Sequence, residues 1–118
     1  MKKLETYLLE YVQKGDSILI KGTTGTGKTT LAEELYDSIE DKRDVVLMDE
    51  IRTHEDAELA VKLLEEGTQV IGTVFSRGSK SHDLFDKHTV TMFDVEARVN
   101  RYGYEEFKYD IDYLKINK

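Results

Sequence analysis

A glycine-rich segment near the N-terminus has the residue types and the spacing of a phosphate-binding loop. Gly22, Gly27, Lys28 and Thr29 satisfy the pattern G-x-x-x-x-G-K-[ST]. Glycines let the backbone turn tightly against an anion, so that consecutive N–H groups and a helix N-terminus point at phosphate oxygens. Lys28 would then bridge β- and γ-phosphate oxygens, and the Thr29 hydroxyl would be a ligand of Mg²⁺. The predicted nucleotide-binding residues are Gly22, Thr23, Thr24, Gly25, Thr26, Gly27, Lys28, Thr29 and Thr30.

Two carboxylates follow an apolar run about twenty residues later, in the segment V-V-L-M-D-E that ends at Glu50. This is a Walker B pattern, in which a buried strand delivers acids to its carboxyl end. We expect Asp49 to hold Mg²⁺ and Glu50 to orient or deprotonate the attacking water. The plainer interpretation is that two acids simply end a strand before a loop. If the strand is regularly pleated, the two side chains point to opposite faces and only one of them contacts the metal.

A third apolar run ends in hydroxyl and basic residues. Ligands of open α/β sheets bind beyond the carboxyl ends of the strands, so Thr73 or Ser76 is a candidate sensor of the γ-phosphate. Arg77 is a candidate catalytic residue that stabilises transition-state charge, in cis or as an arginine finger in trans, although a solvated loop charge explains it equally well. The three histidines lack metal-ligand spacing, and no site is assigned to them.

The elements that must position these residues follow from the hydrophobic pattern. Residues 2–14 and 29–40 have helical periodicity, and a helix is expected from Thr53 to about Glu66, with Asp56 completing an approximate capping box. Apolar runs at 17–21, 44–50 and 68–75 predict strands, and the first of them is expected to be buried on both faces as in a parallel sheet. Strand–helix units in series predict a parallel sheet with right-handed crossovers.

The last third of the chain changes from helical periodicity to alternation. One face is expected to carry Phe93, Val95, Ala97 and Val99, and another to carry Phe107, Tyr109, Ile111 and Tyr113. Because residues 100–106 contain Gly103, these two strands predict an antiparallel β-hairpin at the edge of the sheet. The apolar phase slips between Met92 and Phe93, which indicates a bulge or a fully buried strand start.

Composition limits the class of protein. The 118 residues predict one domain spanning 1–118, and a net charge of −7 argues against coating nucleic acid or an anionic membrane by bulk electrostatics. The chain has no Cys, so it has no thiolate nucleophile or thiolate metal site. Without a leader pattern or an apolar run of 18 residues, we expect a cytoplasmic protein with no membrane insertion.

Three segments within residues 18–76 are G-T-T-G-T-G-K-T-T-L, D-E-I-R-T-H-E-D-A-E-L-A and E-E-G-T-Q-V-I-G-T-V-F-S. Together they resemble the nucleotide-binding core of type II and type IV secretion and pilus-motor ATPases. The resemblance assigns Lys28 and Thr29 to phosphate and Mg²⁺, and Glu50 to the Walker B acid, with Asp49 in place of the usual Gly. The strand that carries an acidic box in that family has no room here, and Phe75 replaces its His. We also expect no N-terminal domain of the kind that this family uses for hexamer assembly. The resemblance implies ATP binding and slow hydrolysis more than force generation.

We therefore expect an α/β fold, a RecA-like P-loop core on a short parallel sheet, with an N-terminal helix and the C-terminal hairpin. The expected function is Mg-dependent ATP binding and slow hydrolysis within a homo-oligomer or a larger protein machine. ATP is favoured over GTP because the chain lacks the N-K-x-D and T-K-x-D signatures of guanine recognition. The alternatives are a non-catalytic nucleotide-dependent switch or accessory module, and a small nucleotide or metabolite kinase.

Overall fold

The apolar runs form one sheet of five strands, to which the amphipathic segments add helices. The computed structural model describes residues 4–23, 27–75, 87–100 and 110–117. The elements are α1 (Leu4–Gln13), β1 (Ile18–Gly22), α2 (Lys28–Asp37), β2 (Val45–Ile51), α3 (His54–Glu65), β3 (Gln69–Phe75), α4 (Lys87–Val90), β4 (Val95–Asn100) and β5 (Asp110–Ile116). The expected α/β fold is confirmed.

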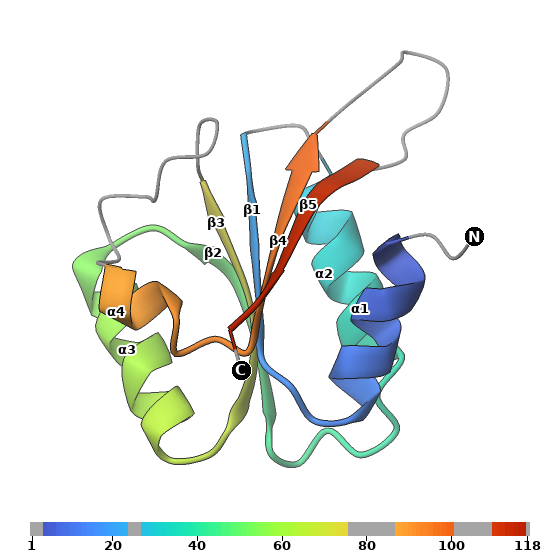
Figure 1. Cartoon of the computed structure of the whole chain (residues 1–118). Coiled ribbons are helices and arrows are strands. Elements are labelled where there is room, and N and C mark those ends of the chain that lie inside the picture. The colour runs from blue at the N-terminus through green and yellow to red at the C-terminus, as the bar shows by residue number, and fades with distance from the viewer. Residues whose placement is uncertain (1–3, 24–26, 76–86, 101–109, 118) are drawn as a thin grey trace.

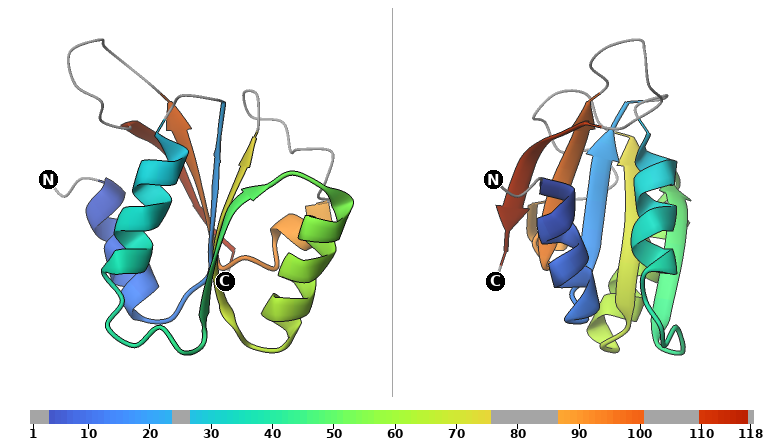
Figure 2. Two further views of the ribbon diagram at one scale, coloured as in Figure 1. Left: turned by 180° about the vertical axis from the view of Figure 1, so that it is seen from behind. Right: turned by 90° about the vertical axis from the view of Figure 1, so that its right-hand side faces the viewer.

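The strand order is β2-β3-β1-β4-β5, with β1 in the centre (Figures 1 and 2). Strand β1 pairs in parallel with β3 and with β4, and β2 pairs in parallel with β3. Strand β5 runs antiparallel to β4 and forms one edge of the sheet. The predicted parallel sheet and the antiparallel strand pair at its edge are therefore present.

Helices cover both faces of the sheet, which gives three layers. Helices α1 and α2 lie side by side on one face, and α3 and α4 lie on the other (Figures 1 and 2). Side chains alternate along β1, so that Ile18 and Ile20 join the core under α1 and α2, whereas Leu19 joins the core under α3. Both sides of the central strands are thus buried, as their nearly continuous apolar sequences predict.

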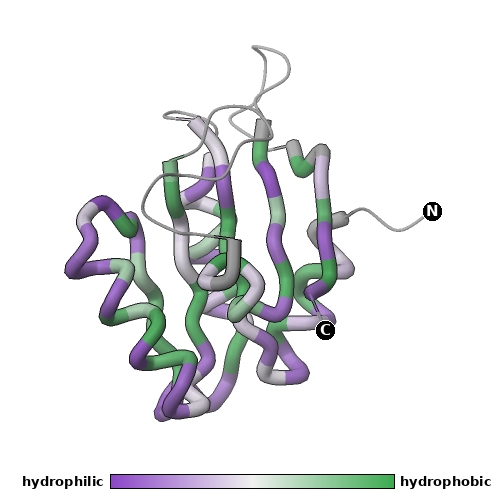
Figure 3. The backbone as a smooth tube through the Cα atoms, turned by 60° about the vertical axis from the view of Figure 1, so that its left-hand side comes forward, coloured by the Kyte–Doolittle hydropathy of each residue, from purple (hydrophilic) through white to green (hydrophobic). Residues whose placement is uncertain are grey.

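The helices alternate between hydrophilic and hydrophobic segments, whereas the central strands are mostly hydrophobic (Figure 3). Each helix therefore has one side suited to the sheet and one suited to water. Within the described ranges, no helix has the length and apolar character needed to cross a membrane.

The helices that follow the adjacent parallel strands β1 and β3 lie on opposite faces of the sheet. Strand β1 leads into α2 on one face, whereas β3 leads toward α4 on the opposite face (Figure 1). Ligands of open α/β sheets bind at such a switch point, beyond the carboxyl ends of the two adjacent strands. The glycine-rich loop begins at the carboxyl end of β1.

The foot of β1 is tied to both neighbouring strands through one residue. The Ser17 hydroxyl oxygen accepts a hydrogen bond from the Val70 N–H at 2.9 Å, and the Ser17 N–H donates to Asp94 Oδ2 at 2.8 Å. The Ser17 carbonyl also accepts from the Val95 N–H at 3.1 Å. These bonds fix the level at which β1 sits between β3 and β4.

The C-terminal strands depart from the predicted alternation in two places. Phe93 precedes β4 and packs in the core under α3, whereas Val95, Ala97 and Val99 face α1 and α2. The prediction that Phe93 shares their face was wrong, because the chain enters β4 only at Val95, and the change of face comes after Phe93 and not before it as predicted.

The alternation predicted for the last strand also fails. The register of β4 with β5 shifts between Arg98 and Val99, so Ile111 and Leu114 face the α1/α2 core, whereas Tyr113 is 41% exposed. The predicted shared face of Ile111 and Tyr113 was wrong because of this irregularity. Phe107, Tyr109 and the predicted turn at 100–106 lie wholly or mostly outside the described residues.

Helix α3 begins with the predicted capping box. The Thr53 hydroxyl oxygen accepts from the Asp56 N–H at 3.1 Å, and Asp56 Oδ2 accepts from the N–H groups of Thr53 at 3.1 Å and Arg52 at 3.0 Å. The N–H of Arg52 and then that of Thr53 are the main causes that hold the pKa of Asp56 below its ordinary value.

We expect Asp56→Asn to lower stability at neutral pH and to have a diminishing effect as pH falls. Because the pKa of Asp56 is lower folded than unfolded, its charge stabilises the fold above the unfolded pKa of 3.8. This contribution disappears as pH falls through the folded pKa. Melting temperatures of both proteins between pH 7 and pH 2.5 should converge at the acid end, and a constant difference would contradict the assignment.

Candidate functional site

The glycine-rich loop joins β1 directly to α2, as a phosphate-binding loop requires. Gly27 caps α2 with φ 94° and ψ 16°, a left-handed conformation that favours glycine. The Leu31 N–H donates to the Gly27 carbonyl at 3.0 Å and starts the helix. The first N–H groups of a helix have no partner within the helix and are available to an anion. Thr24, Gly25 and Thr26 lie outside the described residues.

The Lys28 side chain is buried at the start of α2, directly after the glycine-rich loop. The residue is 6% exposed, and its Nζ lies 3.1 Å from Glu50 Oε2. Nζ also donates a long hydrogen bond of 3.5 Å to the Thr23 carbonyl and lies 5.9 Å from the centre of the Phe75 ring. A lysine is rarely buried without a counter-ion, so Glu50 is the group that makes this position tolerable.

Asp49 accepts hydrogen bonds from two hydroxyl groups, one from α2 and one from β3. Its Oδ1 accepts hydrogen bonds from Thr29 Oγ1 at 3.1 Å and from Thr73 Oγ1 at 2.7 Å. Thr29 is the second residue of α2, and Thr73 is fully buried in β3. Thr73, considered from the sequence as a phosphate sensor, thus contacts the carboxylate in this structure.

Both carboxylates reach the N-terminus of α2, although consecutive residues of a regular strand point to opposite faces. The register of β2 with β3 shifts between Met48 and Ile51. After this irregularity Ile51 packs in the core under α3, on the face opposite to Asp49, which frees Glu50 to turn toward Lys28. The expectation of opposite faces for Asp49 and Glu50 does not hold here.

Two further residues contact the site, and neither was assigned to it from the sequence. Arg52 Nε lies 3.4 Å from Glu50 Oε1, so that Glu50 lies between one buried and one exposed cation. The Phe75 ring, opposite Gly22 in the register of β1 with β3, lies beside the Lys28 ammonium. Arg52 could have been noticed because it follows the acids by two residues, whereas the location of Phe75 depends on strand register.

The residues present fit a hydrated magnesium ion. One hydroxyl and one carboxylate, from Thr29 and Asp49, lie within 3.1 Å of each other. Mg²⁺ prefers oxygen ligands and usually keeps several waters while it binds one or two protein groups and substrate phosphates. Among the described residues, no group of three or more His, Asp or Glu side chains is placed to hold a metal ion by itself. The site therefore suits a metal that arrives with a nucleotide.

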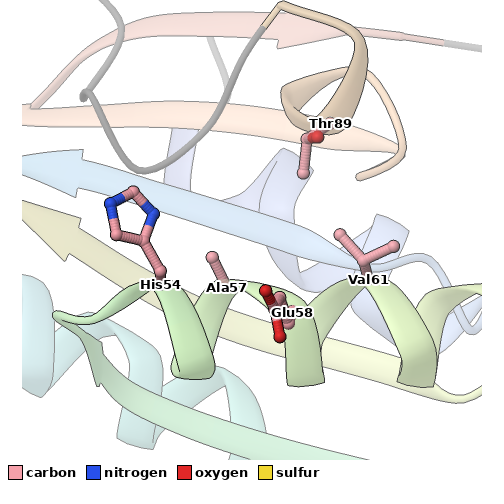
Figure 4. A pocket seen from close by; sticks show the side chains of 5 residues that line it. All are labelled: His54, Ala57, Glu58, Val61 and Thr89. Atoms are coloured by element: carbon pink, nitrogen blue, oxygen red, sulfur yellow. The ribbon is translucent and has the colours of Figure 1, made fainter.

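A hollow lies between α3 and α4, away from the phosphate-binding loop (Figure 4). Its volume is about 230 Å³, and its lining residues are His54, Ala57, Glu58, Val61 and Thr89. His54 is the first residue of α3, as the sequence predicts, and lines this hollow. The volume is below the 300–1,000 Å³ that is usual for sites of small organic ligands, so no ligand is assigned to this hollow.

The family model of the CobW/HypB/UreG nucleotide-binding domain matches residues 16–114, which is most of the chain. The protein belongs to this family. The match spans every element from β1 to β4 and includes the glycine-rich loop and both carboxylates. A P-loop nucleotide-binding core is therefore shown for this CobW/HypB/UreG domain, which gives the contacts around Lys28 a functional setting.

Among solved structures, the CobW/HypB/UreG domain is similar to the VirB11 ATPase of the Brucella suis type IV secretion system, determined with sulphate. The TM-score is 0.72 at 15% sequence identity, and the alignment covers 97% of this chain and 52% of VirB11. This chain thus spans about half the length of VirB11, and the likeness confirms the expected fold. Comparison with curated proteins gives no match.

Proposed function

We propose that this domain binds Mg-ATP at the carboxyl ends of β1 and β3 and hydrolyses it slowly within a larger assembly. The observation that carries the proposal is the contact of Lys28 and Thr29, consecutive residues of the phosphate-binding loop, with two different carboxylates. A structural turn needs neither contact. In the proposed function, Lys28 binds phosphate, Thr29 and Asp49 hold the metal, and Glu50 takes a proton from water.

The charges at the site favour a nucleotide that binds together with a metal ion. Lys28 and Arg52 are balanced by Asp49 and Glu50. A nucleoside triphosphate adds several negative charges beside these carboxylates, and a divalent cation offsets the repulsion. We propose that Thr29 and Asp49 would hold Mg²⁺, which would supply positive charge to the phosphate oxygens.

The proposed reaction transfers the γ-phosphoryl group to water. Phosphate oxygens displace the Glu50 carboxylate from the Lys28 ammonium, and Glu50 becomes free to accept a proton from water. The water oxygen forms a bond to the γ-phosphorus while the bond from phosphorus to the β,γ-bridging oxygen breaks, so that ADP carries the electron pair away. Arg52 keeps Glu50 near the site after Lys28 turns to the nucleotide.

Release of inorganic phosphate from Mg-ATP, without an added acceptor, tests this function. Hydrolysis supports the proposal, ADP formation that requires an acceptor supports the kinase alternative, and binding without turnover supports a switch. Membership in the CobW/HypB/UreG family makes a GTP-dependent switch the second candidate. Parallel titrations with ATP and GTP decide between the bases, and tighter binding of GTP would overturn the choice of ATP.

We expect activity per chain to rise with protein concentration or with a partner. Arg77 lies outside the described residues, and we propose it as an arginine finger that acts in trans, a contribution of about 10³–10⁵ in rate. Phosphate release measured over a hundredfold dilution should fall per chain, and Arg77→Ala should remove the dependence on concentration. Specific activity that is constant in both proteins would exclude a finger supplied by a second copy.

A further inference from the structure

Thr73 places a hydroxyl group where the fold itself calls for an apolar side chain. It is 0% exposed, lies in β3 between buried apolar neighbours, and pairs in register with Ile20 of the central strand. A buried hydroxyl is costly unless it is hydrogen-bonded. Its bond to Asp49 Oδ1, at 2.7 Å, satisfies it with a charged acceptor, the stronger class of hydrogen bond.

The second hydroxyl on the same oxygen belongs to a residue with a different task. Thr29 is exposed and is the proposed magnesium ligand, so its hydroxyl must adjust when the ion binds. Thr73 has no such task, and its β-branched side chain is confined in the core to few rotamers. Of the two donors, Thr73 is therefore the one that can hold Asp49 in the same orientation with and without the metal.

The backbone of Asp49 also lacks regular support. Asp49 lies in the stretch of β2 between Met48 and Ile51, where the register with β3 shifts. A side-chain bond from β3 replaces, at this point, the fixation that a regular ladder provides. Both hydroxyls donate to Asp49 Oδ1. Among the contacts of the described residues, Asp49 Oδ2 is therefore available to accept a hydrogen bond from a water of hydrated Mg²⁺.

We propose that Thr73 is a positioning residue for the metal site, which orients the Asp49 carboxylate toward hydrated Mg²⁺ through its buried hydroxyl. This inference rests on the proposed function, since it requires that a Mg-nucleotide binds here. Groups that orient metal ligands commonly contribute 10- to 100-fold in metal affinity. Thr73 acts through Asp49 and need not contact phosphate.

Thr73→Val tests the proposal because it removes the hydroxyl and nearly keeps the shape of the side chain. With ATP fixed, the Mg²⁺ concentration for half-maximal binding should rise about tenfold, as measured by calorimetry. Nucleotide binding in EDTA should change little, since Thr73 is proposed to act only through the metal site. Thr73→Ser keeps the hydroxyl and should restore the Mg²⁺ requirement of the wild type.

Combination with Asp49→Asn separates positioning from general packing. Once the carboxylate charge is absent, adding Thr73→Val should change the Mg²⁺ requirement by much less than it does in the wild type. An unchanged Mg²⁺ requirement in Thr73→Val, or equal effects in both backgrounds, would overturn the role of Thr73. Failure of the wild type to bind ATP in any Mg²⁺ concentration would instead overturn the proposed function.

Discussion

Glu50→Gln is expected to reduce ATP hydrolysis by about 10²–10⁴-fold while ATP still binds. Glutamine keeps the size and hydrogen-bonding capacity of the side chain but cannot take a proton from water. The contact of Glu50 with Lys28 adds a second expectation. In the wild type, phosphate must displace a carboxylate from the ammonium, whereas in the variant no ion pair has to be broken. ATP should therefore bind at least as tightly as in the wild type.

The same substitution should weaken the empty protein. The buried Lys28 ammonium would lose its counter-ion, and a buried charge without a partner is destabilising. The expected combination is a lower melting temperature without nucleotide, a larger rise with Mg-ATP, and slow phosphate release. Glu55→Gln, an exposed substitution on the first turn of α3, is the matched control and should leave all three unchanged. Hydrolysis by Glu50→Gln at the wild-type rate would refute the assignment of the base.

Lys28→Ala is expected to abolish most of the stabilisation by Mg-ATP. A ligand that binds only the folded state at 100 times its Kd stabilises a protein by about 2.7 kcal/mol. For a domain of this size that corresponds to a rise in Tm on the order of 10 °C. Without the ammonium, the phosphates would meet the Glu50 carboxylate with no opposing charge from the loop, so the shift should nearly vanish.

Thermal unfolding with saturating Mg-ATP measures this effect directly. Lys62→Ala removes a lysine from the exposed part of α3 and serves as the control, with a shift equal to that of the wild type. A wild-type Tm that does not respond to Mg-ATP or to Mg-GTP would contradict nucleotide binding at this site.

The parallel core could be predicted from the sequence because its elements depend on local signals. Helical periodicity and short apolar runs located α2, α3 and the first three strands, and Gly15 and Gly67 end their helices with positive φ. The capping box was also predicted from a local signal, because its two residues, Thr53 and Asp56, are three positions apart.

The failures share a different cause. The orientation of Glu50 and the shared face of Ile111 and Leu114 follow irregularities in strand register, whereas the face of Phe93 follows from the start of β4 at Val95. Register is determined by partners that are distant in sequence, so a pattern of alternation within one strand cannot reveal where it breaks. The role suggested for Thr73 depends on a distant contact of the same kind, because Asp49 lies 24 positions away in sequence.

The hydrogen bonds at Ser17 have a consequence for how the chain folds during its synthesis. They join residues that are 53 and 77 positions apart, and β1 has no strand partner closer in sequence than β3. Non-local pairing of this kind delays folding, because long loops must close before any contact compensates for the lost chain entropy. As the chain leaves the ribosome, the central strand and its glycine-rich loop must therefore wait, unpaired, until β3 has emerged, and both of its neighbours are in place only after β4. Nucleotide can then assist folding only after β4 has been made.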